Sequence, residues 1–285
     1  MSTAYLNGSY LPLEEARISP LDRGFLFGDG IYEVVPSYGG RMVGFGPHIE
    51  RMRSGLAAID IKLDWSDSDW RELCENLISA NGAGNLGLYL HVSRGADARR
   101  HHAYPENINQ TVFAYTFEIP PAPVADRSTT PTYTAITAPD LRWKRCNIKS
   151  TALLGNVLHY NQAHQGGDSE TILYNENGEV TEAAACNVFV VKDGVIATPD
   201  TDHQILPGIT RLLMLEILRA DGSVPVEERI VTLDELRHAD EVWLASSTKE
   251  IAPVIMVDGA PVGDGEVGAI WEQAQALFSE YKYDY

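Results

Sequence analysis

The 285-residue sequence is poor in basic residues and in cysteine, and it has no long apolar run. Its 22 Lys and Arg residues are outnumbered by 40 Asp and Glu residues, which gives a formal charge of −18. A surface of this sign repels nucleic acid and anionic membranes, so neither is an expected partner. No apolar stretch is long enough to span a bilayer, and the first residues do not form a secretory signal. We therefore expect a cytoplasmic protein.

The three cysteines, Cys74, Cys146 and Cys186, lie far apart in the sequence. None belongs to a CxxC pair, which excludes the common zinc and redox motifs and fits a reducing compartment. The histidines show no metal-ligand spacing either. We predict no metal site.

A proline-rich segment separates two parts of the chain. A length of 285 residues with 44% hydrophobic residues is enough for two globular domains. Residues 119–124 read IPPAPV, a stiff segment that is typical of a linker. We predict a small N-terminal α/β domain over 1–118, a linker over 119–130 and a larger C-terminal α/β domain over 131–285. The expected fold class is α+β.

Turn and capping signals predict the individual elements. Asn7-Gly8 and Gly39-Gly40 are typical of hairpin turns, and Pro47 suits the first turn of a helix. The predicted hairpins cover 5–10 and the two strands 31–38 and 41–45, and further strands are predicted over 86–94, 111–117, 131–138, 171–174, 187–191, 224–230 and 241–245. The predicted helices cover 47–59, 67–80, 153–165, 209–220 and 265–281.

Residues 182–211 carry the clearest chemical signal. Glu182 follows the turn NENGEV, where a buried carboxylate could meet a cationic ring nitrogen. The turn at 207–210 offers backbone N–H groups and a hydroxyl at a helix start, a combination that suits phosphate. A phosphate and a protonated ring nitrogen together indicate pyridoxal phosphate, whose enzymes also need a Schiff-base lysine.

The strongest candidate for that lysine is Lys149. It lies in NIKSTALLGN, between Ile148 and a small-residue helix start, with three basic residues at 142–145 upstream. Partial burial and nearby cations lower the pKa of an amine, as a nucleophilic lysine requires. The alternative is a surface lysine at the end of a strand. Among the other lysines, Lys249 follows three hydroxyl residues and is the next candidate.

Several separated motifs together resemble one family. The segments DRGFLFGDGIYEVV, PHIERM and NIKSTALLGN and the pattern at 182–211 occur in the order found in the class IV pyridoxal-phosphate aminotransferases, the fold type IV group. The similarity covers nearly the whole chain and is closest to D-amino-acid aminotransferases. It implies two α/β domains with the cofactor in the cleft between them. It also implies a homodimer whose substrate loop can come from the neighbouring subunit.

The resemblance implies a role for each matching residue. Lys149 would bind the cofactor covalently and then move the proton between the substrate Cα and the cofactor. Glu182 would keep the pyridine nitrogen protonated, and Arg51 would pair with the phosphate. Further cofactor contacts would come from Leu206, Ile209, Thr210, Ser246 and Ser247, with Thr248 as the alternative in a shifted register.

One departure from the family concerns the segment after Glu182. Relatives often carry serines there, whereas this chain reads Ala183-Ala184-Ala185-Cys186. The hydroxyl contacts of such serines with the cofactor would be absent or replaced by a thiol, which would affect cofactor affinity. Cys186 is then either a small buried residue or a weak donor.

The substrate carboxylate is expected elsewhere. In D-amino-acid aminotransferases a tyrosine and an Arg-x-His pair bind it, and Tyr32 matches the tyrosine. The loop SRGADARRHHAYPEN allows two registers: Arg100 with His102, which we prefer, and Arg99 with His101. A cation and an imidazole N–H can hold a carboxylate in a partly desolvated site. The alternative is a flexible basic surface loop.

We therefore predict a pyridoxal-phosphate transaminase with ping-pong kinetics. It would move the amino group of a D-amino acid such as D-alanine to 2-oxoglutarate or pyruvate. An (R)-selective amine transaminase, a branched-chain L-amino-acid aminotransferase and an aminodeoxychorismate lyase are the alternatives with the same cofactor. Tyr32 and the Arg-x-His pair favour the D-amino acid. A non-catalytic pyridoxal-phosphate binder is the alternative from another class, and Lys149 with Glu182 argues against it.

Overall fold

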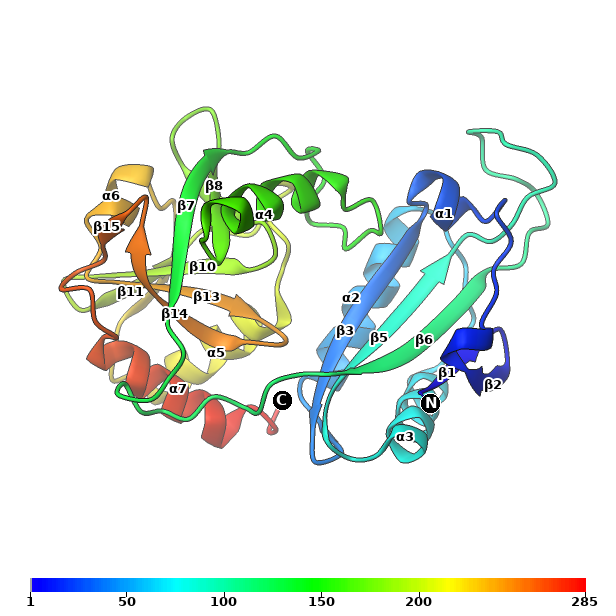
Figure 1. Cartoon of the computed structure of the whole chain (residues 1–285), viewed down its shortest axis with the longest axis horizontal. Coiled ribbons are helices and arrows are strands. Elements are labelled where there is room, and N and C mark those ends of the chain that lie inside the picture. Colours follow the sequence, from blue (N-terminus) through cyan, green and yellow to red (C-terminus); the bar gives the residue numbers. More distant parts are fainter. Residues whose placement is uncertain (1) are drawn as a thin grey trace. The chain divides into compact units, whose positions relative to one another are not determined.

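Two units, each built on its own β-sheet, make up the chain. The computed structural model describes residues 2–285. The first unit runs to Pro121 and also includes Ile148–Leu153, and the second comprises Ala122–Asn147 and Leu154–Tyr285. Figure 1 labels most of their helices and strands. The predicted α+β class is confirmed.

An antiparallel sheet of six strands forms the first unit, in the order β2-β1-β6-β5-β3-β4. The Asn7-Gly8 turn joins the first two strands, and both residues have positive φ, as the turn prediction requires. The strands are β1 (Thr3–Leu6), β2 (Ser9–Pro12), β3 (Gly30–Tyr38), β4 (Arg41–Met42), β5 (Asn85–Ser93) and β6 (Thr111–Glu118). The helices are the 3-10 turn η1 (Leu13–Glu15), α1 (Arg23–Phe27), α2 (Phe45–Ala58) and α3 (Asp67–Asn81).

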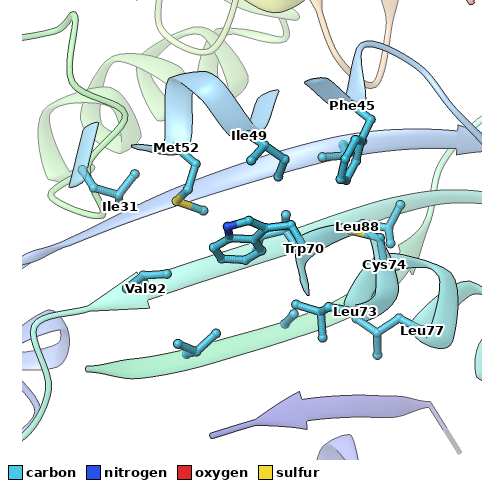
Figure 2. Close-up of a cluster of buried hydrophobic side chains, with 14 of the residues drawn as sticks. Ile31, Phe45, Ile49, Met52, Trp70, Leu73, Cys74, Leu77, Leu88 and Val92 are labelled. Atoms are coloured by element: carbon cyan, nitrogen blue, oxygen red, sulfur yellow. The ribbon is translucent and has the colours of Figure 1, made fainter. Parts of the chain in front are cut away.

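Helices α2 and α3 pack on the sheet of this unit through one apolar cluster. Alternate residues of β5, among them Leu88 and Val92, point toward Met52 of α2 and Trp70 of α3, and Figure 2 shows this cluster. Trp70 is 1% exposed, and Leu88 and Met52 are fully buried. Burying such side chains stabilises the unit by about 1.5–3 kcal/mol each relative to exposure. This core fixes β3, the strand that carries Tyr32.

The sheet of the second unit is mixed. Its strands follow the order β12-β11-β10-β13-β14-β7-β8-β9, with β15 beside β14, and three of the pairings are parallel. The strands are β7 (Tyr133–Pro139), β8 (Glu170–Tyr174), β9 (Val180–Ala183), β10 (Asn187–Lys192), β11 (Val195–Thr198), β12 (Val226–Glu228), β13 (Glu241–Ser246), β14 (Glu250–Val257) and β15 (Ala260–Pro261). The helices are α4 (Leu154–Gly166), α5 (Ile209–Asp221), α6 (Leu233–Arg237) and α7 (Ala269–Tyr281). No helix of residues 2–285 is long and apolar enough to cross a membrane.

One predicted strand is too long, and one central strand was not predicted. The strand predicted over 41–45 ends at Met42, because Gly44 adopts φ 60° and starts α2 at Phe45. The sequence reading also missed β14, in which Pro253 argues against a central strand. Pro253 is tolerated because the pairing of β14 with β7 starts only at Val254.

The segment Ile148–Leu153 belongs to the first unit, although the predicted domain boundary placed it in the second. Its backbone is hydrogen-bonded to the start of β3. The Tyr32 N–H donates to the Lys149 carbonyl at 3.1 Å, and the Thr151 N–H donates to the Gly30 carbonyl at 3.0 Å. These hydrogen bonds join residues that are far apart in the sequence, so no local pattern predicts them. They place the segment in the first unit.

Candidate active site

In the first unit, Lys149 lies beside Tyr32. The Lys149 Nζ is 4.3 Å from the centroid of the Tyr32 ring, and this ring stacks on Tyr89 with centroids 5.6 Å apart. Lys149 is half-buried between the buried residues Ile148 and Ser150. The structure thus brings together the candidate Schiff-base lysine and the candidate substrate tyrosine.

Arg51 is held by a buried carboxylate. Its Nε and Nη2 donate to the two oxygens of Glu33, each at 2.7 Å, and His48 Nδ1 lies 2.7 Å from the same carboxylate. Burial alone would raise the pKa of Glu33, but Arg51 and His48 outweigh it and lower this pKa far below its ordinary value. Burial lowers the pKa of His48, and Glu33 offsets this only in part. The guanidinium is therefore fixed in one orientation.

In the second unit, Glu182 of β9 is surrounded by N–H donors. Arg142 Nη1 donates to Oε1 at 2.5 Å, and the Leu206 N–H donates to Oε2 at 3.1 Å. The Asn187 side-chain amide donates to Oε2 at 3.3 Å. Arg142 is shared, because it also pairs with Asp140 at 2.7 Å. Burial raises the pKa of Glu182 to about 7, and Arg142 only partly offsets this.

Asn187 connects Glu182 to the glycine turn before α5. Besides binding Glu182, its amide donates to the Leu206 carbonyl at 2.9 Å. A Cβ on Gly208 would lie only 1.9 Å from Asn187 Oδ1, so the close approach requires glycine at 208. Asn187 also pairs in register with Ala245, the residue before Ser246. One asparagine thus links the carboxylate, the turn and the end of β13.

The helix start and the end of β13 offer unused donors. Helix α5 begins at Ile209 without a side-chain cap, so the first amides of the helix, those of Ile209 and Thr210 among them, have no intrahelical acceptor. The Ser246 hydroxyl is buried and has no hydrogen-bond partner within residues 2–285. Ser247 and Thr248 follow it in the turn to β14 and are half-buried.

The candidate substrate loop lies over α1 of the first unit. The Arg100 guanidinium is 5.0 Å from the centroid of the Phe27 ring, and the His102 ring is 5.3 Å from the same ring. Both members of the preferred register therefore pack on one aromatic side chain. Arg99 and His101 are exposed, like the rest of residues 98–104.

These features can be compared with known proteins. The model of the family "Amino-transferase class IV" matches residues 30–257. The chain belongs to the class IV aminotransferases. The family resemblance inferred from the motifs is confirmed, and amino-group transfer is the chemistry of the family.

Relatives of this class IV aminotransferase match it almost from end to end. It is 40% identical to the D-alanine aminotransferase of Listeria monocytogenes serotype 1/2a (strain 10403S) over 96% of this chain and 94% of the relative. It is 38% identical to the D-alanine aminotransferase of Staphylococcus aureus (strain MW2) over 99% of this chain and 98% of the relative.

Solved structures share the fold of this aminotransferase. The branched-chain amino acid aminotransferase of Escherichia coli superposes with a TM-score of 0.88 at 23% identity, covering 98% of this chain and 94% of the other. The branched-chain aminotransferase of Thermoproteus uzoniensis, solved with norvaline, superposes with a TM-score of 0.85 at 22% identity, covering 99% of this chain and 95% of the other. The likeness confirms the type IV fold.

Sequence reasoning about this aminotransferase missed several residues. Glu33 and Arg142, the ion-pair partners of Arg51 and Glu182, were given no such role, because no spacing connects them to their partners. Asn187 lies inside the recognised motif, and its amide within an apolar strand was the available signal. Arg211, which ends the motif, is buried and donates to the Pro199 carbonyl and to Glu228, a structural role.

Cys186 is a buried donor in this aminotransferase. Its Sγ lies 3.7 Å from Glu170 Oε2, and burial raises the pKa of the thiol to about 12. The thiol therefore stays protonated near neutral pH. It fills a buried position, as one of the two expectations held, and its weak donor contact is with a carboxylate of the protein.

Proposed function

We propose that this class IV aminotransferase binds pyridoxal 5′-phosphate and transfers the amino group of a D-amino acid of the D-alanine type to a 2-oxo acid. Relatives that are 38–40% identical over nearly the whole chain are D-alanine aminotransferases. The observation that carries the proposal is the approach of the Lys149 amine to the Tyr32 ring, at 4.3 Å.

The residues of each unit suit this cofactor. A buried hydroxyl at Ser246 and the amides of Ile209 and Thr210, which have no acceptor within the helix, are donors of the kind that phosphate accepts. Three N–H groups bind Glu182 where a carboxylate offers about four acceptor positions, so one remains on Oε1 for a ring N–H. A cationic ring nitrogen there would favour the ionised form of Glu182.

We assign the following roles. Lys149 carries the cofactor and moves a proton at the substrate Cα, while Glu182 holds the ring nitrogen. When bound, the cofactor supplies an electron sink for the charge left at that carbon. Arg51, oriented by Glu33, binds the phosphate together with Ile209, Thr210, Ser246 and Ser247, and Leu206 packs against the ring. Tyr32, Arg100 and His102 bind the substrate carboxylate.

Lys249 is the other candidate lysine that could compete with Lys149. Its Nζ lies 5.3 Å from the centroid of the Tyr133 ring. Burial lowers the pKa of Lys249, but charge interactions with the acidic groups around it, the Glu170 carboxylate among them, outweigh this effect and raise the pKa. Its amine therefore stays protonated and is a poor nucleophile.

We also propose a homodimer in the cytoplasm. An exposed apolar strip on α4 of the second unit supports a second copy, because Leu154, Val157 and Leu158 share one helix face and are 72%, 56% and 63% exposed. The three cysteines are free, which suits a reducing compartment. Sedimentation equilibrium tests the dimer, and a monomer at all concentrations would contradict it.

The lysine assignment is tested by borohydride reduction of the holoenzyme followed by peptide mapping. We expect the cofactor adduct on Lys149, and an adduct on Lys249 would overturn the assignment. Substrate class is tested by following the absorbance of the lysine-bound cofactor after adding D-alanine, L-leucine or (R)-1-phenylethylamine. We expect D-alanine to remove it, and a response to L-leucine alone would refute the proposed substrate.

A further inference from the structure

The loop that carries Arg100 and His102 has few supports of its own. Residues 98–104 are exposed and contain no helix or strand. An exposed segment of this kind loses conformational entropy when it is fixed in one geometry. If the loop is to hold a carboxylate in one geometry, something else must fix it.

Arg23 of α1 is hydrogen-bonded to the backbone of this loop. Its Nη1 donates to the His101 carbonyl at 2.5 Å, and its Nη2 donates to the His102 carbonyl at 3.2 Å. Its Nε donates to Asp29 Oδ2 at 2.7 Å. Arg23 is only 3% exposed, and its guanidinium lies 4.9 Å from the Phe27 centroid, the ring on which Arg100 and His102 also pack.

Arg94 contacts Tyr104, at the C-terminal end of the same loop. Its guanidinium lies 3.5 Å from the centroid of the Tyr104 ring, a close cation–π contact. It donates from Nε and Nη2 to both oxygens of Asp29, at 2.8 and 3.0 Å, and also binds the carbonyls of Ile59 and Asp60. Asp29 therefore joins two buried arginines into one rigid group.

We propose that Arg23, Asp29 and Arg94 form a clamp that positions Arg100 and His102 for the substrate carboxylate. The inference rests on the proposed function of the loop. The clamp acts through the carbonyls of residues 101 and 102 and the ring of Tyr104, so its members are positioning residues and touch no substrate. Hydrogen bonds from a charged guanidinium are roughly twice as strong as neutral ones, and a buried arginine such as Arg23 can therefore hold a short exposed loop.

The test replaces Arg23 by Gln in the holoenzyme, with Arg17→Gln as the matched control. Arg17 is an exposed arginine that, among the described residues 2–285, donates only to the nearby carbonyls of Glu14 and Ala16. One readout is the rate of trypsin cleavage after Arg99 and Arg100, which needs no activity. The others are KM and kcat for D-alanine and the dissociation constant of the cofactor, measured by absorbance titration.

For Arg23→Gln we expect cleavage at Arg99 and Arg100 to quicken about tenfold or more. KM for D-alanine should rise about 10- to 100-fold, with kcat and cofactor affinity changed less than about threefold. Arg23→Lys keeps the charge but loses the two-pronged contact, so it should restore only part of the loss. Arg17→Gln should match the wild type in every readout.

A folded Arg23→Gln enzyme with unchanged cleavage would overturn the proposal, and so would faster cleavage with an unchanged KM. If Arg23→Gln does not fold, Tyr104→Ala removes the Arg94 contact at a 53% exposed side chain, and the same two criteria apply to it. A wild-type enzyme that does not react with D-alanine would refute the proposed function instead. The cleavage readout would still decide whether the clamp holds the loop.

Discussion

Replacing Gly208 by alanine should disturb both the Glu182 carboxylate and the turn before α5. The backbone at Gly208 has φ −66° and ψ 136°, which alanine adopts without strain. The added Cβ would lie 1.9 Å from Asn187 Oδ1, far inside van der Waals contact. The effect of the substitution is therefore steric, and Asn187 must move.

The size of the effect follows from the two hydrogen bonds that the Asn187 side chain donates. Moving its amide breaks the bond to the Leu206 carbonyl at 2.9 Å and the bond to Glu182 at 3.3 Å. Losing one neutral and one charged hydrogen bond costs about 2–4 kcal/mol. For a unit of this size we expect the melting temperature to fall by roughly 5–10 °C. The displaced carboxylate should weaken cofactor binding about tenfold, equivalent to about 1.4 kcal/mol.

The assay combines thermal unfolding of the apoenzyme with absorbance titration of pyridoxal phosphate. Gly46→Ala is the matched control, because Gly46 lies in α2 and a Cβ there meets no atom within 4 Å. That substitution should be neutral or stabilise the helix by up to about 1 kcal/mol. The pair Gly208→Ala and Asn187→Ala completes a double-mutant cycle. If the clash lies on Asn187, the double variant should resemble Asn187→Ala alone.

A Gly208→Ala enzyme with the melting temperature and cofactor affinity of the wild type would refute this reasoning. So would a cycle in which the two substitutions simply add, because the clash would then lie on some other group.

Two further predictions concern buried carboxylates. Glu33→Gln removes the buried carboxylate that pairs with Arg51 and His48 and should cost about 3 kcal/mol or more in urea unfolding, whereas Asp67→Asn, which removes an exposed carboxylate that pairs with Arg53, should change little. Equal costs would contradict the first prediction. Because the pKa of Glu182 is raised from 4.5 to about 7, its contribution to apoenzyme stability is full below pH 4.5 and is lost as the pH rises through 7. The melting temperature of Glu182→Gln, measured relative to that of the wild type, should therefore rise as the pH increases from 4.5 to 7. A difference that stays constant over this range would contradict the prediction.

The local patterns were informative because they depend on neighbours in sequence. The Asn7-Gly8 hairpin and the helices α3 and α5 follow from turn chemistry, capping and apolar spacing, which act over a few residues. The weak elements were missed for the same reason. Strand β9 has four residues and helix α1 has five, too few to show a period.

The sequence by itself determined the family and the chemical character of the site, since the motif order around Lys149 and the residues from Glu182 to Arg211 matches the class IV aminotransferases. Only the tertiary structure decided which residues contact one another in the site. Backbone hydrogen bonds to β3 bring Lys149 beside Tyr32, and folding of the first unit brings Arg23 within hydrogen-bonding distance of the 98–104 loop. These pairs are far apart in the chain, and their contacts depend on strand register and core packing, which no local pattern encodes.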